Sequence, residues 1–534
     1  MRPLIQEIPT AHTPESLVET LGGAAGVVLL RSALFESPHA RYSFVTAEPF
    51  LTFRSSGSRC EIMQPATHGP PQVQFGNPWH LLDALMSRYE LLDEIDLPFP
   101  LGGCFGYWGY DLKNFVEPKL PRRAVNDLEL PDCQVGFYDS LVVFDHHLGK
   151  VCIVSTGLAA DGSRADRRAW ERTEWWRSRL AGDPERTQPK NQNAPSPHPS
   201  PPFRMEERVA AGRERRPFEV QGFKARIIPA NSLPGEEGRG EGERSATTQE
   251  ITSSFSRADF LAAVARAQRY IRAGDIYQVN LSHRLAVPFA ESGWQLFERL
   301  AAVSPAPFAA FLDCGEFQLA SSSPELFLRL SGPHITTRPI KGTRPRSPDA
   351  TRDAQLAYEL QTSPKELAEL VMITDLLRND LGRVCEFGSV QVPELARLER
   401  FPQVQHLVST IEGRLRPEAT HFRAFASCFP GGSITGAPKF RAMEIIDELE
   451  PLARGPYTGC HGYLGFNRES QLSISIRTAI RQAGHAYFQV GAGIVADSIP
   501  AAEYEETLAK GRGFVAALAA LPGCAVRRHA SVRT

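Results

Sequence analysis

Lys341 is the side chain whose local sequence is most suited to nucleophilic chemistry. It lies in Thr337–Arg346, where Pro339 fixes the backbone before it and Gly342 frees the backbone after it. A free lysine has a pKa of about 10.4 and is protonated at neutral pH. Burial and neighbouring cations lower that pKa and produce an attacking amine. The segment supplies three such cations: Arg338, Arg344 and Arg346. A basic surface turn is the alternative interpretation.

Two predicted helices each carry a pair of glutamates on one face. Glu366 and Glu369 are three residues apart, and Glu503 and Glu506 have the same spacing in the final helix. If the two faces converge, their carboxylates could hold Mg²⁺, which takes one or two carboxylates together with waters and an anionic substrate. For the final helix alone, an exposed pair between Glu506 and Lys510 is the simpler interpretation.

Two further segments are suited to bind an anion. Phe429–Lys439 is rich in glycine and leads directly into a predicted helix, whose N-terminal amides attract anions, although its spacing is not that of a P-loop. Arg477 lies on a predicted strand whose near face is small, so its guanidinium could bind a carboxylate through two hydrogen bonds. Gly491 and Gly493 end the adjoining predicted strand and would let the backbone approach a ligand closely.

Length and composition exclude several classes of protein. A chain of 534 residues is too long for one ordinary core, and a formal charge of −2 argues against nucleic acid as the main partner. The nine cysteines are scattered without a Cys-x-x-Cys pair, which is typical of reduced thiols in a cytoplasmic protein. The first residues do not resemble a signal peptide, and Ala24–Leu30 is too short to cross a membrane.

Composition divides the chain into four parts. Residues 1–181 alternate strand-like runs with helices such as Pro78–Tyr89, and we expect an N-terminal subdomain there. Residues 182–255 are dense in Pro, Gly, Glu and Arg and cannot bury enough apolar surface, so we expect a disordered linker or insertion. Regular patterns resume in residues 256–520, a second predicted domain, and 521–534 form a tail.

Helix caps and strand alternation define the elements of the second domain. Ser256 and Ser363 are predicted N-caps, each followed three residues later by an acidic residue. Ile276–Pro288 alternates in polarity and places Asn280 and Ser282 on its polar face.

Two longer elements follow near the end of the chain. We predict one strand over Leu472–Arg481 and one final helix over Pro500–Leu518. Runs of hairpin-like strands interrupted by single helices indicate an α+β fold with largely antiparallel sheets.

From about Ser256 to Leu518, the chain resembles the chorismate-utilising enzymes. This family includes component I of anthranilate synthase and of aminodeoxychorismate synthase, isochorismate synthases and salicylate synthases. The resemblance implies a large sandwich of two subdomains with mostly antiparallel sheets and helices outside. The segments that carry it occur in family order: Ile276–Ser282, Ser321–Leu326, Pro339–Arg346, Leu370–Asp380, His406–Ile411, Gly432–Lys439 and Gly491–Ser498.

Two positions discriminate within the family. Anthranilate synthases carry Ala where this chain has Lys341, and the isochorismate- and salicylate-forming members carry Lys where it has Gln278. Both positions resemble aminodeoxychorismate synthase component I, which implies amination of chorismate at C4 through a covalent adduct on Lys341. Anthranilate synthase component I is the alternative, with the amine at C2.

The resemblance also implies roles for individual residues. Glu325 matches the general acid/base, and its apolar flanks suit a carboxyl kept protonated. His406 matches a position near the ring carboxylate, although a hydrogen-bonded core histidine is an equal interpretation. Mg²⁺ would be held by Glu369 and Glu506, with Glu366 and Glu503 as outer or alternate ligands. The remaining implied substrate contacts are Gln278, Thr343, Thr435, Gly436, Tyr463, Arg477, Gly491, Gly493 and Lys510.

The resemblance implies partners as well. We find no plausible Cys/His/Glu amidotransferase domain in the sequence, so ammonia would come from solution or from a separate glutamine amidotransferase subunit. Leu34–Ser37 resembles the tryptophan-pocket motif of the family, with Ser37 as a possible contact, but an amphipathic strand end explains it equally. A catalytically silent carboxylate-binding subunit is the alternative from another class. It predicts loss of at least one catalytic position, and all are present: Lys341, Glu325, Glu369 and Glu506.

Overall fold

The computed structural model describes residues 2–32, 40–65, 69–92, 97–182, 251–401 and 404–519, and two short strands that pair with each other, β11 (Ile227–Ile228) and β26 (Ala525–Val526). Nearly all of the predicted linker at 182–255 and of the tail at 521–534 lies outside these residues, and so does Ser37. Those predictions therefore stay predictions.

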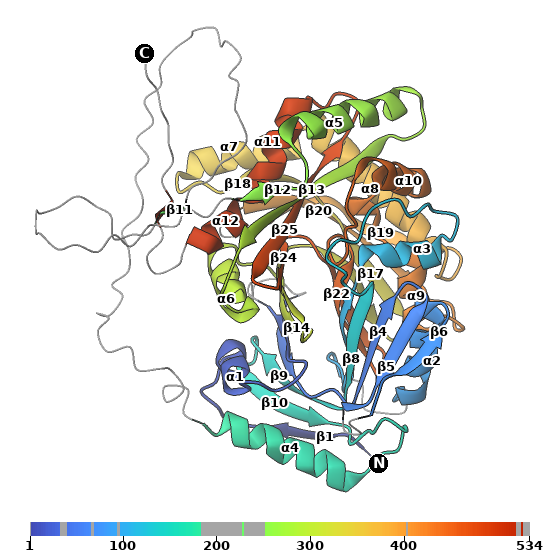
Figure 1. Ribbon diagram of the computed structural model, residues 1–534, viewed down its shortest axis with the longest axis vertical. Coiled ribbons are helices and arrows are strands. Elements are labelled where there is room, and N and C mark those ends of the chain that lie inside the picture. Colours follow the sequence, from blue (N-terminus) through green and yellow to red (C-terminus); the bar gives the residue numbers. More distant parts are fainter. Residues whose placement is uncertain are drawn as a thin grey trace, which may run out of the picture.

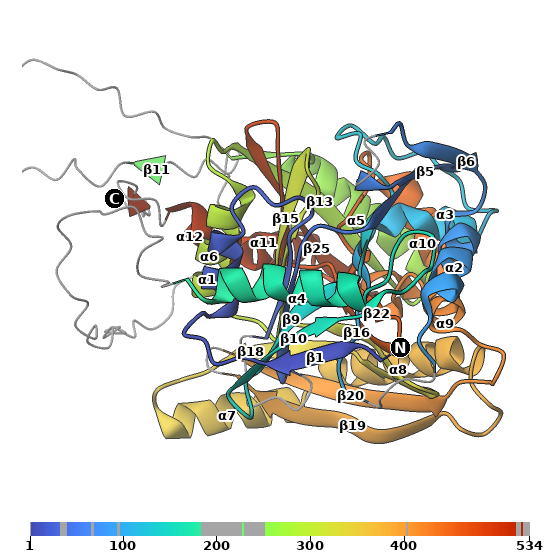
Figure 2. The ribbon, with the colours of Figure 1, turned by 90° about the horizontal axis from the view of Figure 1, so that it is seen from below.

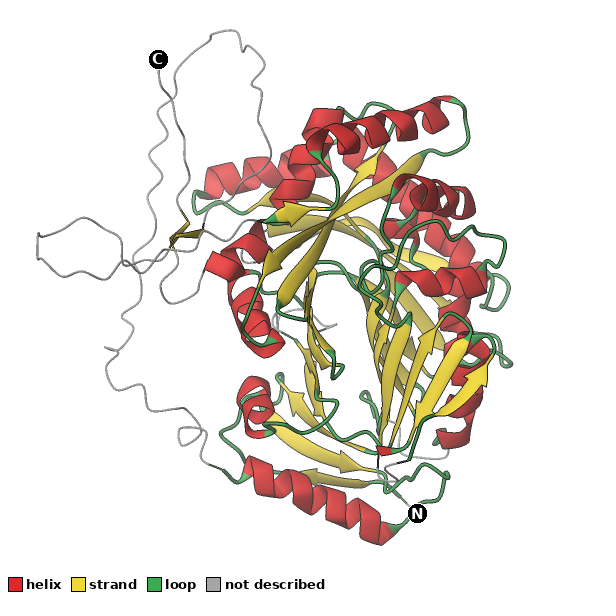
Figure 3. Ribbon diagram, viewed as in Figure 1, coloured by secondary structure: helices red, strands yellow, loops and turns green. Residues whose placement is uncertain are grey.

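Two large antiparallel sheets form the centre of the molecule, and the helices lie outside them (Figures 1 and 3). This arrangement confirms the predicted α+β fold. The first sheet runs in the order β1 (Leu4–Glu7), β10 (Lys150–Ser155), β9 (Ser140–Asp145), β3 (Tyr42–Thr46), β2 (Val28–Arg31), β14 (Phe308–Asp313), β15 (Phe317–Ser323), β24 (Thr478–Gln482), β25 (His485–Ile494), β13 (Gln278–Pro288) and β12 (Thr252–Ser253), with β21 (Gly436–Ala437) beside β13.

The second sheet has the same number of strands, twelve, and the same antiparallel pairing. Its order is β18 (Ile340–Pro345), β20 (Val404–Arg414), β17 (His334–Arg338), β16 (Leu326–Ser331), β23 (Glu469–Ile474), β22 (Cys460–Gly465), β7 (Gly103–Trp108), β8 (Cys133–Tyr138), β4 (Leu51–Ser56), β5 (Arg59–Met63) and β6 (Gln72–Phe75), with β19 (Gln391–Arg400) beside β20.

Each sheet combines strands from both predicted subdomains. In the first sheet β2 pairs with β14, and in the second sheet β7 pairs with β22. The larger hydrophobic cluster likewise joins Phe105 of β7 to Tyr463 of β22. Residues 1–181 and 256–520 therefore share two sheets and a common core, and the boundary that composition predicts is not a spatial boundary.

The helices cover the outer faces of the two sheets. α8 and α7 pack on β18 and β20 at one end of the second sheet, as Figure 2 shows, and α11 packs on β25 of the first sheet. The helices are α1 (Pro14–Thr20), α2 (Pro78–Tyr89), α3 (Lys113–Val116), α4 (Asp166–Leu180), α5 (Arg257–Arg272), α6 (Gly293–Val303), α7 (Ala350–Gln361), α8 (Pro364–Gly382), α9 (His421–Cys428), α10 (Lys439–Leu449), α11 (Pro500–Lys510) and α12 (Arg512–Ala519).

Several predicted helix ends are confirmed. Asn77 caps α2, whose bounds are those predicted. The Ser256 hydroxyl accepts a hydrogen bond from the Asp259 amide at 3.1 Å and caps α5. Ser363 caps α8 through the Glu366 amide at 3.4 Å. The Glu366 side chain does not complete a capping box, because it pairs with Arg344 instead.

Two predicted elements are each divided in the structure. Leu472–Arg481 is not one strand, because β23 belongs to the second sheet and β24 to the first, and Arg477 lies between them at φ +49°. The final predicted helix separates at Gly511 into α11 and α12. Gly491 and Gly493 lie within β25 and not at its end, since β25 continues to Ile494.

Two expectations drawn from composition can be compared with the described residues. Every cysteine among them is a free thiol. None of the helices that the structure describes combines the length and the apolar character that a membrane span requires.

Candidate active site

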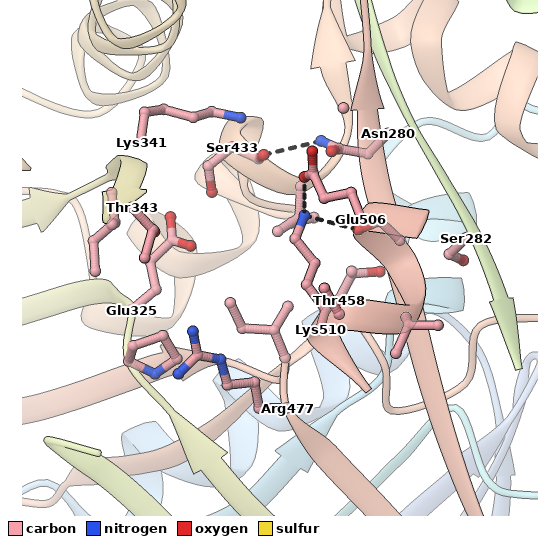
Figure 4. Close-up of a pocket in the computed structure, with 18 of the residues that line it drawn as sticks. Asn280, Ser282, Glu325, Lys341, Thr343, Ser433, Thr458, Arg477, Glu506 and Lys510 are labelled. Atoms are coloured by element: carbon pink, nitrogen blue, oxygen red, sulfur yellow. Dashed lines mark hydrogen bonds and ion pairs between the residues drawn. The ribbon is translucent and has the colours of Figure 1, made fainter. Parts of the chain in front are cut away.

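A cavity of about 640 Å³ is lined by strands of both sheets and by neighbouring helices. Its lining includes residues of β13 and β25 of the first sheet, of β18 and β20 of the second sheet, of the helices α6, α8, α11 and α12, and of the segments around residues 325, 433, 458 and 477. Figure 4 shows ionisable side chains from several of these elements directed into one space. Segments far apart in the sequence therefore converge on a single site.

Lys341 enters this cavity from β18 and is largely buried. Its Nζ lies 3.9 Å from Oε2 of Glu369. Burial lowers the pKa of Lys341 below its ordinary value; the carboxylates of Glu369 and Glu325 oppose that shift, and the charge of Lys510 adds to it. The amine is thus closer to its neutral, nucleophilic form than a surface lysine is.

The three arginines of the segment are not among the largest influences on the pKa of Lys341, contrary to the prediction. Each arginine has an acidic partner that neutralises its charge locally. The pairs are Arg338 with Glu399, Arg344 with Glu366 and Arg346 with Asp353.

Gly342 produces a bulge in β18 directly after the lysine. Its φ is +64°, a conformation that favours glycine, and the register with β20 shifts there. A Cβ atom at this position would lie 2.6 Å from Leu360 Cδ1 and 3.0 Å from Glu366 Oε2. The missing side chain therefore lets α7 and α8 pack against the strand that carries Lys341.

Glu325 lies between β15 and β16 and is buried at the cavity wall. Burial raises the pKa of its carboxyl, against a hydrogen bond with Ser433 and the charge of Lys341. The direction agrees with the expected protonated carboxyl. A carboxyl of raised pKa and an amine of lowered pKa in one cavity are suited to act as general acid and nucleophile.

His406 of β20 faces the cavity beside Thr343 of β18. The His406 Nδ1 and the Thr343 Oγ1 are hydrogen-bonded at 2.9 Å. Burial, aided by the charge of Arg477, lowers the pKa of His406 to about 4. The imidazole is therefore neutral at pH 7 and can exchange a proton only as a neutral donor or acceptor.

Arg477 reaches the cavity from the break between β23 and β24 (Figure 4). Burial alone lowers the pKa of this guanidinium, and no carboxylate among the described residues pairs with it. A buried cation without a counter-ion is costly unless an anion binds there. Its position thus fits a carboxylate-binding residue, although the small-residue strand on which we expected it is interrupted at Arg477 itself.

The four predicted metal ligands all line the cavity. Glu366 and Glu369 come from α8, and Glu503 and Glu506 come from α11. Burial raises the pKa of Glu369 and of Glu503, and the charge of Glu506 adds to both shifts. Within the described residues, no group of three or more His, Cys, Asp or Glu is spaced to hold a metal ion. One carboxylate from each helix, completed by substrate and water, is nevertheless a donor set that suits Mg²⁺.

Each of these acids also has a partner within the protein. Lys510 Nζ lies 2.9 Å from Glu506 Oε1 and donates to the carbonyl oxygen of Gly491 at 2.9 Å. Glu506 and Lys510 therefore form the expected i,i+4 pair and also line the cavity. The Ser498 hydroxyl donates to Glu503 at 2.6 Å. The Lys510 contact with Gly491 therefore ties α11 to β25.

Tyr463 does not line the cavity, so its expected contact with substrate is not supported. Its ring packs in the core against Phe44 and Phe105, with ring centroids 5.2 and 5.4 Å apart. Tyr457, six residues earlier, lines the cavity in its place. Tyr457 and Tyr463 both lie in one glycine-rich stretch of the sequence. Only the folded structure shows which of them lines the cavity.

Three further predicted contacts lie behind the lining. Gly436 forms β21 and pairs with Val279, while the Thr435 hydroxyl donates to the carbonyl oxygen of Gly431 at 3.0 Å. The Gln278 side chain is fully buried, and a Cβ atom on Gly493 would lie 2.5 Å from its Nε2. Gln278 therefore reaches the cavity only through Gly493, which does line it.

Polar lining residues that the site prediction missed include residues of β13 and of two loops. Asn280 and Ser282 lie on the face of β13 that alternation marks as polar, so the pattern could have identified them. Ser433 lies within the predicted anion-binding segment Phe429–Lys439, whereas Thr458 had no comparable signal. The Asn280 side-chain amide donates to the carbonyl oxygen of Ser433 at 2.9 Å, which joins two of these segments (Figure 4).

A second, much smaller cavity lies near the N-terminal strands. Its lining includes Ser32, Tyr42, His461 and Ser473. The predicted tryptophan-site residue, Ser37, falls in the neighbouring range 33–39, outside the described residues.

Comparison with known proteins identifies the family of this chain. The family model described as chorismate binding enzyme matches residues 31–516. The chain belongs to the chorismate binding enzyme family. Among curated relatives, anthranilate synthase component 1 of Thermus thermophilus is 37% identical and covers 95% of both chains. Aminodeoxychorismate synthase component 1 of Salmonella typhimurium is also 37% identical, over 90% of this chain and 91% of the relative.

Solved structures of family members share the fold. Anthranilate synthase component I from Streptococcus pneumoniae has a TM-score of 0.69 at 27% identity and covers 90% of this chain and 93% of its own. The isochorismate synthase MenF from Escherichia coli has a TM-score of 0.65 at 16% identity, over 97% and 94%. Overall identity does not distinguish between the two curated activities, so this chorismate binding enzyme must be assigned from its site.

Proposed function

We propose that the protein converts chorismate and ammonia to 4-amino-4-deoxychorismate, the reaction of aminodeoxychorismate synthase component I. The observation that carries this proposal is the position of Lys341, a buried amine of lowered pKa inside the cavity. The sequence resemblance places alanine at this position in anthranilate synthases, and alanine cannot bond to the substrate. The product would serve the synthesis of 4-aminobenzoate and folate.

The cavity residues support a two-step exchange. Lys341 Nζ bonds to C2 of the ring while the double bond shifts and the C4–O bond breaks; Glu325 donates the proton with which the oxygen leaves as water. Ammonia then bonds to C4, the double bond shifts back, and the C2–N bond to Lys341 breaks. A proton returned to Glu325 completes the cycle, so the net change is hydroxyl replaced by amine.

Binding groups surround these two residues. Arg477, which has no carboxylate partner among the described residues, suits the enolpyruvyl carboxylate, and Tyr457 and Lys510 also line the cavity. Glu369 and Glu506 would hold Mg²⁺, with Glu366 and Glu503 as outer or alternate ligands. When bound, the metal ion supplies Lewis-acid attraction for the ring carboxylate of chorismate.

Ammonia has to be delivered to this site. Relatives named component 1 suggest a separate second component, and we propose a glutamine amidotransferase subunit in a cytoplasmic complex. No membrane or nucleic-acid partner is part of the proposal.

The proposal is tested by mass spectrometry of the enzyme quenched during turnover. We expect a chorismate-derived mass on Lys341. In Lys341→Ala, formation of the C4 amine should fall below detection, because the covalent exchange has no nucleophile, while some C2 amine could form. Undiminished 4-amino-4-deoxychorismate from Lys341→Ala would remove this residue from the mechanism.

Anthranilate synthase component I is the second candidate, because relatives of that name are equally similar to this chain. Incubation with chorismate, ammonium and Mg²⁺ separates the two. Anthranilate is fluorescent and forms without a second enzyme, whereas 4-amino-4-deoxychorismate does not become an aromatic amine unaided.

Glu506→Gln tests the acidic helix faces. We expect turnover to fall about 10²-fold, because a Lewis acid supplies several kcal/mol to such a reaction. Glu505→Gln is the matched control, since Glu505 is exposed on the same helix and does not line the cavity. Equal turnover of the two variants over a Mg²⁺ titration would contradict the assignment.

A further inference from the structure

A buried ion pair lies directly behind the cavity wall. Glu450 is the C-cap of α10 and Arg454 follows four residues later; both side chains are almost completely buried and neither lines the cavity. Arg454 donates from Nε to Glu450 Oε2 at 2.9 Å and from Nη2 to Oε1 at 2.7 Å. Burial acts to lower the pKa of Arg454, and the Glu450 carboxylate more than offsets that effect, so the guanidinium stays charged.

The same pair is bonded to three segments that do line the cavity. The guanidinium Nη1 donates to the carbonyl oxygen of Ile434 at 3.2 Å and to the Thr458 hydroxyl at 3.1 Å, and Nη2 donates to the carbonyl oxygen of Asn280 at 2.9 Å. The carboxylate accepts from both the amide and the hydroxyl of Ser282, at 2.8 and 3.0 Å. One ion pair thus fixes β13 relative to both loops.

The N-terminal half of the chain supports this arrangement from behind. The Tyr110 ring lies 4.7 Å from the guanidinium carbon of Arg454, a cation–π contact. Asp111 accepts a hydrogen bond from the Gly455 amide at 2.9 Å. The segment that carries Arg454 is therefore held on both sides.

Stability alone does not account for such a pair. Well-packed apolar residues often replace a buried ion pair without loss of stability, whereas removing one partner is costly. What apolar residues cannot replace is the planar set of donors, which fixes several carbonyl groups at defined distances. The polar residues held in this way, Asn280, Ser282 and Thr458, lie across the cavity from Lys341 (Figure 4).

We propose that Glu450 and Arg454 are positioning residues, which set the spacing of the cavity wall that holds chorismate in front of Lys341. The pair touches neither substrate nor metal and acts through β13 and the two loops. This inference depends on chorismate binding, which the family establishes, and not on which carbon receives the amine.

The experiment measures kcat and KM from the disappearance of chorismate, which counts every product equally. Arg454→Lys keeps the charge but loses the planar donor set. We expect its KM to rise at least about tenfold, with kcat within about threefold of the wild type. A KM for Arg454→Lys close to that of the wild type would overturn the proposal, because charge alone would then suffice.

Arg172→Met is the matched control for general destabilisation. Arg172 of α4 is also mostly buried and pairs with Glu48 at 2.7 Å and Asp139 at 3.7 Å, but none of these residues lines the cavity. Even if Arg172→Met loses as much thermal stability as Arg454→Lys, its KM for chorismate should equal that of the wild type. If KM rises equally in both variants, the effect is general and the proposal fails.

The double variant Glu450→Gln/Arg454→Met covers the case in which single variants do not fold. It leaves no unpaired charge in the interior, so the fold should survive while the spacing of the wall is lost. We expect the raised KM to persist in this protein. Wild-type KM in the folded double variant would also overturn the proposal.

Discussion

Arg454 and Arg477 are two buried arginines at the same cavity, and their surroundings differ in kind. Arg454 has a carboxylate partner and hydrogen bonds to three segments, and its pKa is raised above the ordinary value. Arg477 has no carboxylate partner among the described residues, lies in a left-handed backbone conformation, and has a lowered pKa because of burial. The contrast separates a charge that is neutralised inside the protein from a charge that has no carboxylate partner among the described residues.

The comparison predicts opposite effects on stability. Arg454→Met should destabilise the fold by about 3–5 kcal/mol, because it leaves the Glu450 carboxylate buried and unpaired. Arg477→Met should leave stability unchanged or raise it, because it removes a buried charge that has no internal partner. Urea unfolding of the two variants measures the difference. Equal destabilisation would mean that Arg477 is also structural.

The same two arginines should differ in catalysis. Arg477→Met should lower kcat/KM for chorismate by about 10²–10³-fold, since a charge-assisted contact to a buried carboxylate contributes a few kcal/mol. Addition of chorismate should no longer raise the thermal unfolding midpoint of this variant. A chorismate-dependent shift equal to that of the wild type would place the carboxylate elsewhere.

Two buried histidines, one in the cavity and one outside it, allow a similar comparison for the pH dependence of stability. Burial lowers the pKa of His406, in the cavity, and of His421, outside it, to about 4. A lowered folded-state pKa contributes stability above pH 6.5 that is lost as the pH falls towards 4, on the order of 2–3 kcal/mol per histidine. His421→Gln should flatten this pH dependence without changing turnover at pH 7, whereas His406→Gln should flatten it and reduce turnover. An unchanged pH dependence in both would contradict the burial argument.

Local patterns predicted the elements better than the connections between them. The caps at Ser256 and Ser363 and the polar face of β13 depend on neighbouring residues, and each is present in the structure. The break at Arg477 has little local signal, because Leu472–Arg481 departs from alternation only from the consecutive polar residues Arg477 and Thr478 onwards. The chain bends there since β23 and β24 belong to different sheets, which is a tertiary constraint.

Some site residues were predicted from the sequence and others were not, because their positions depend on tertiary contacts that have no local signal. Lys341, Glu325 and the four helix glutamates share one cavity, as their motifs indicated. The resemblance pointed to Tyr463, and no local pattern showed that Tyr457 would line the cavity instead. The pair of Glu450 and Arg454 was missed because an i,i+4 pair in sequence is usually an exposed surface contact.

The sharing of both sheets has a consequence for how the protein is made. β22 and β23 separate β16 from β7 in one sheet, and β24 and β25 separate β15 from β13 in the other. All four strands are translated after residue 459, so both layers stay in two pieces with open edges until late in synthesis. During synthesis, the two parts of each sheet therefore cannot be joined until β22 to β25 have emerged from the ribosome.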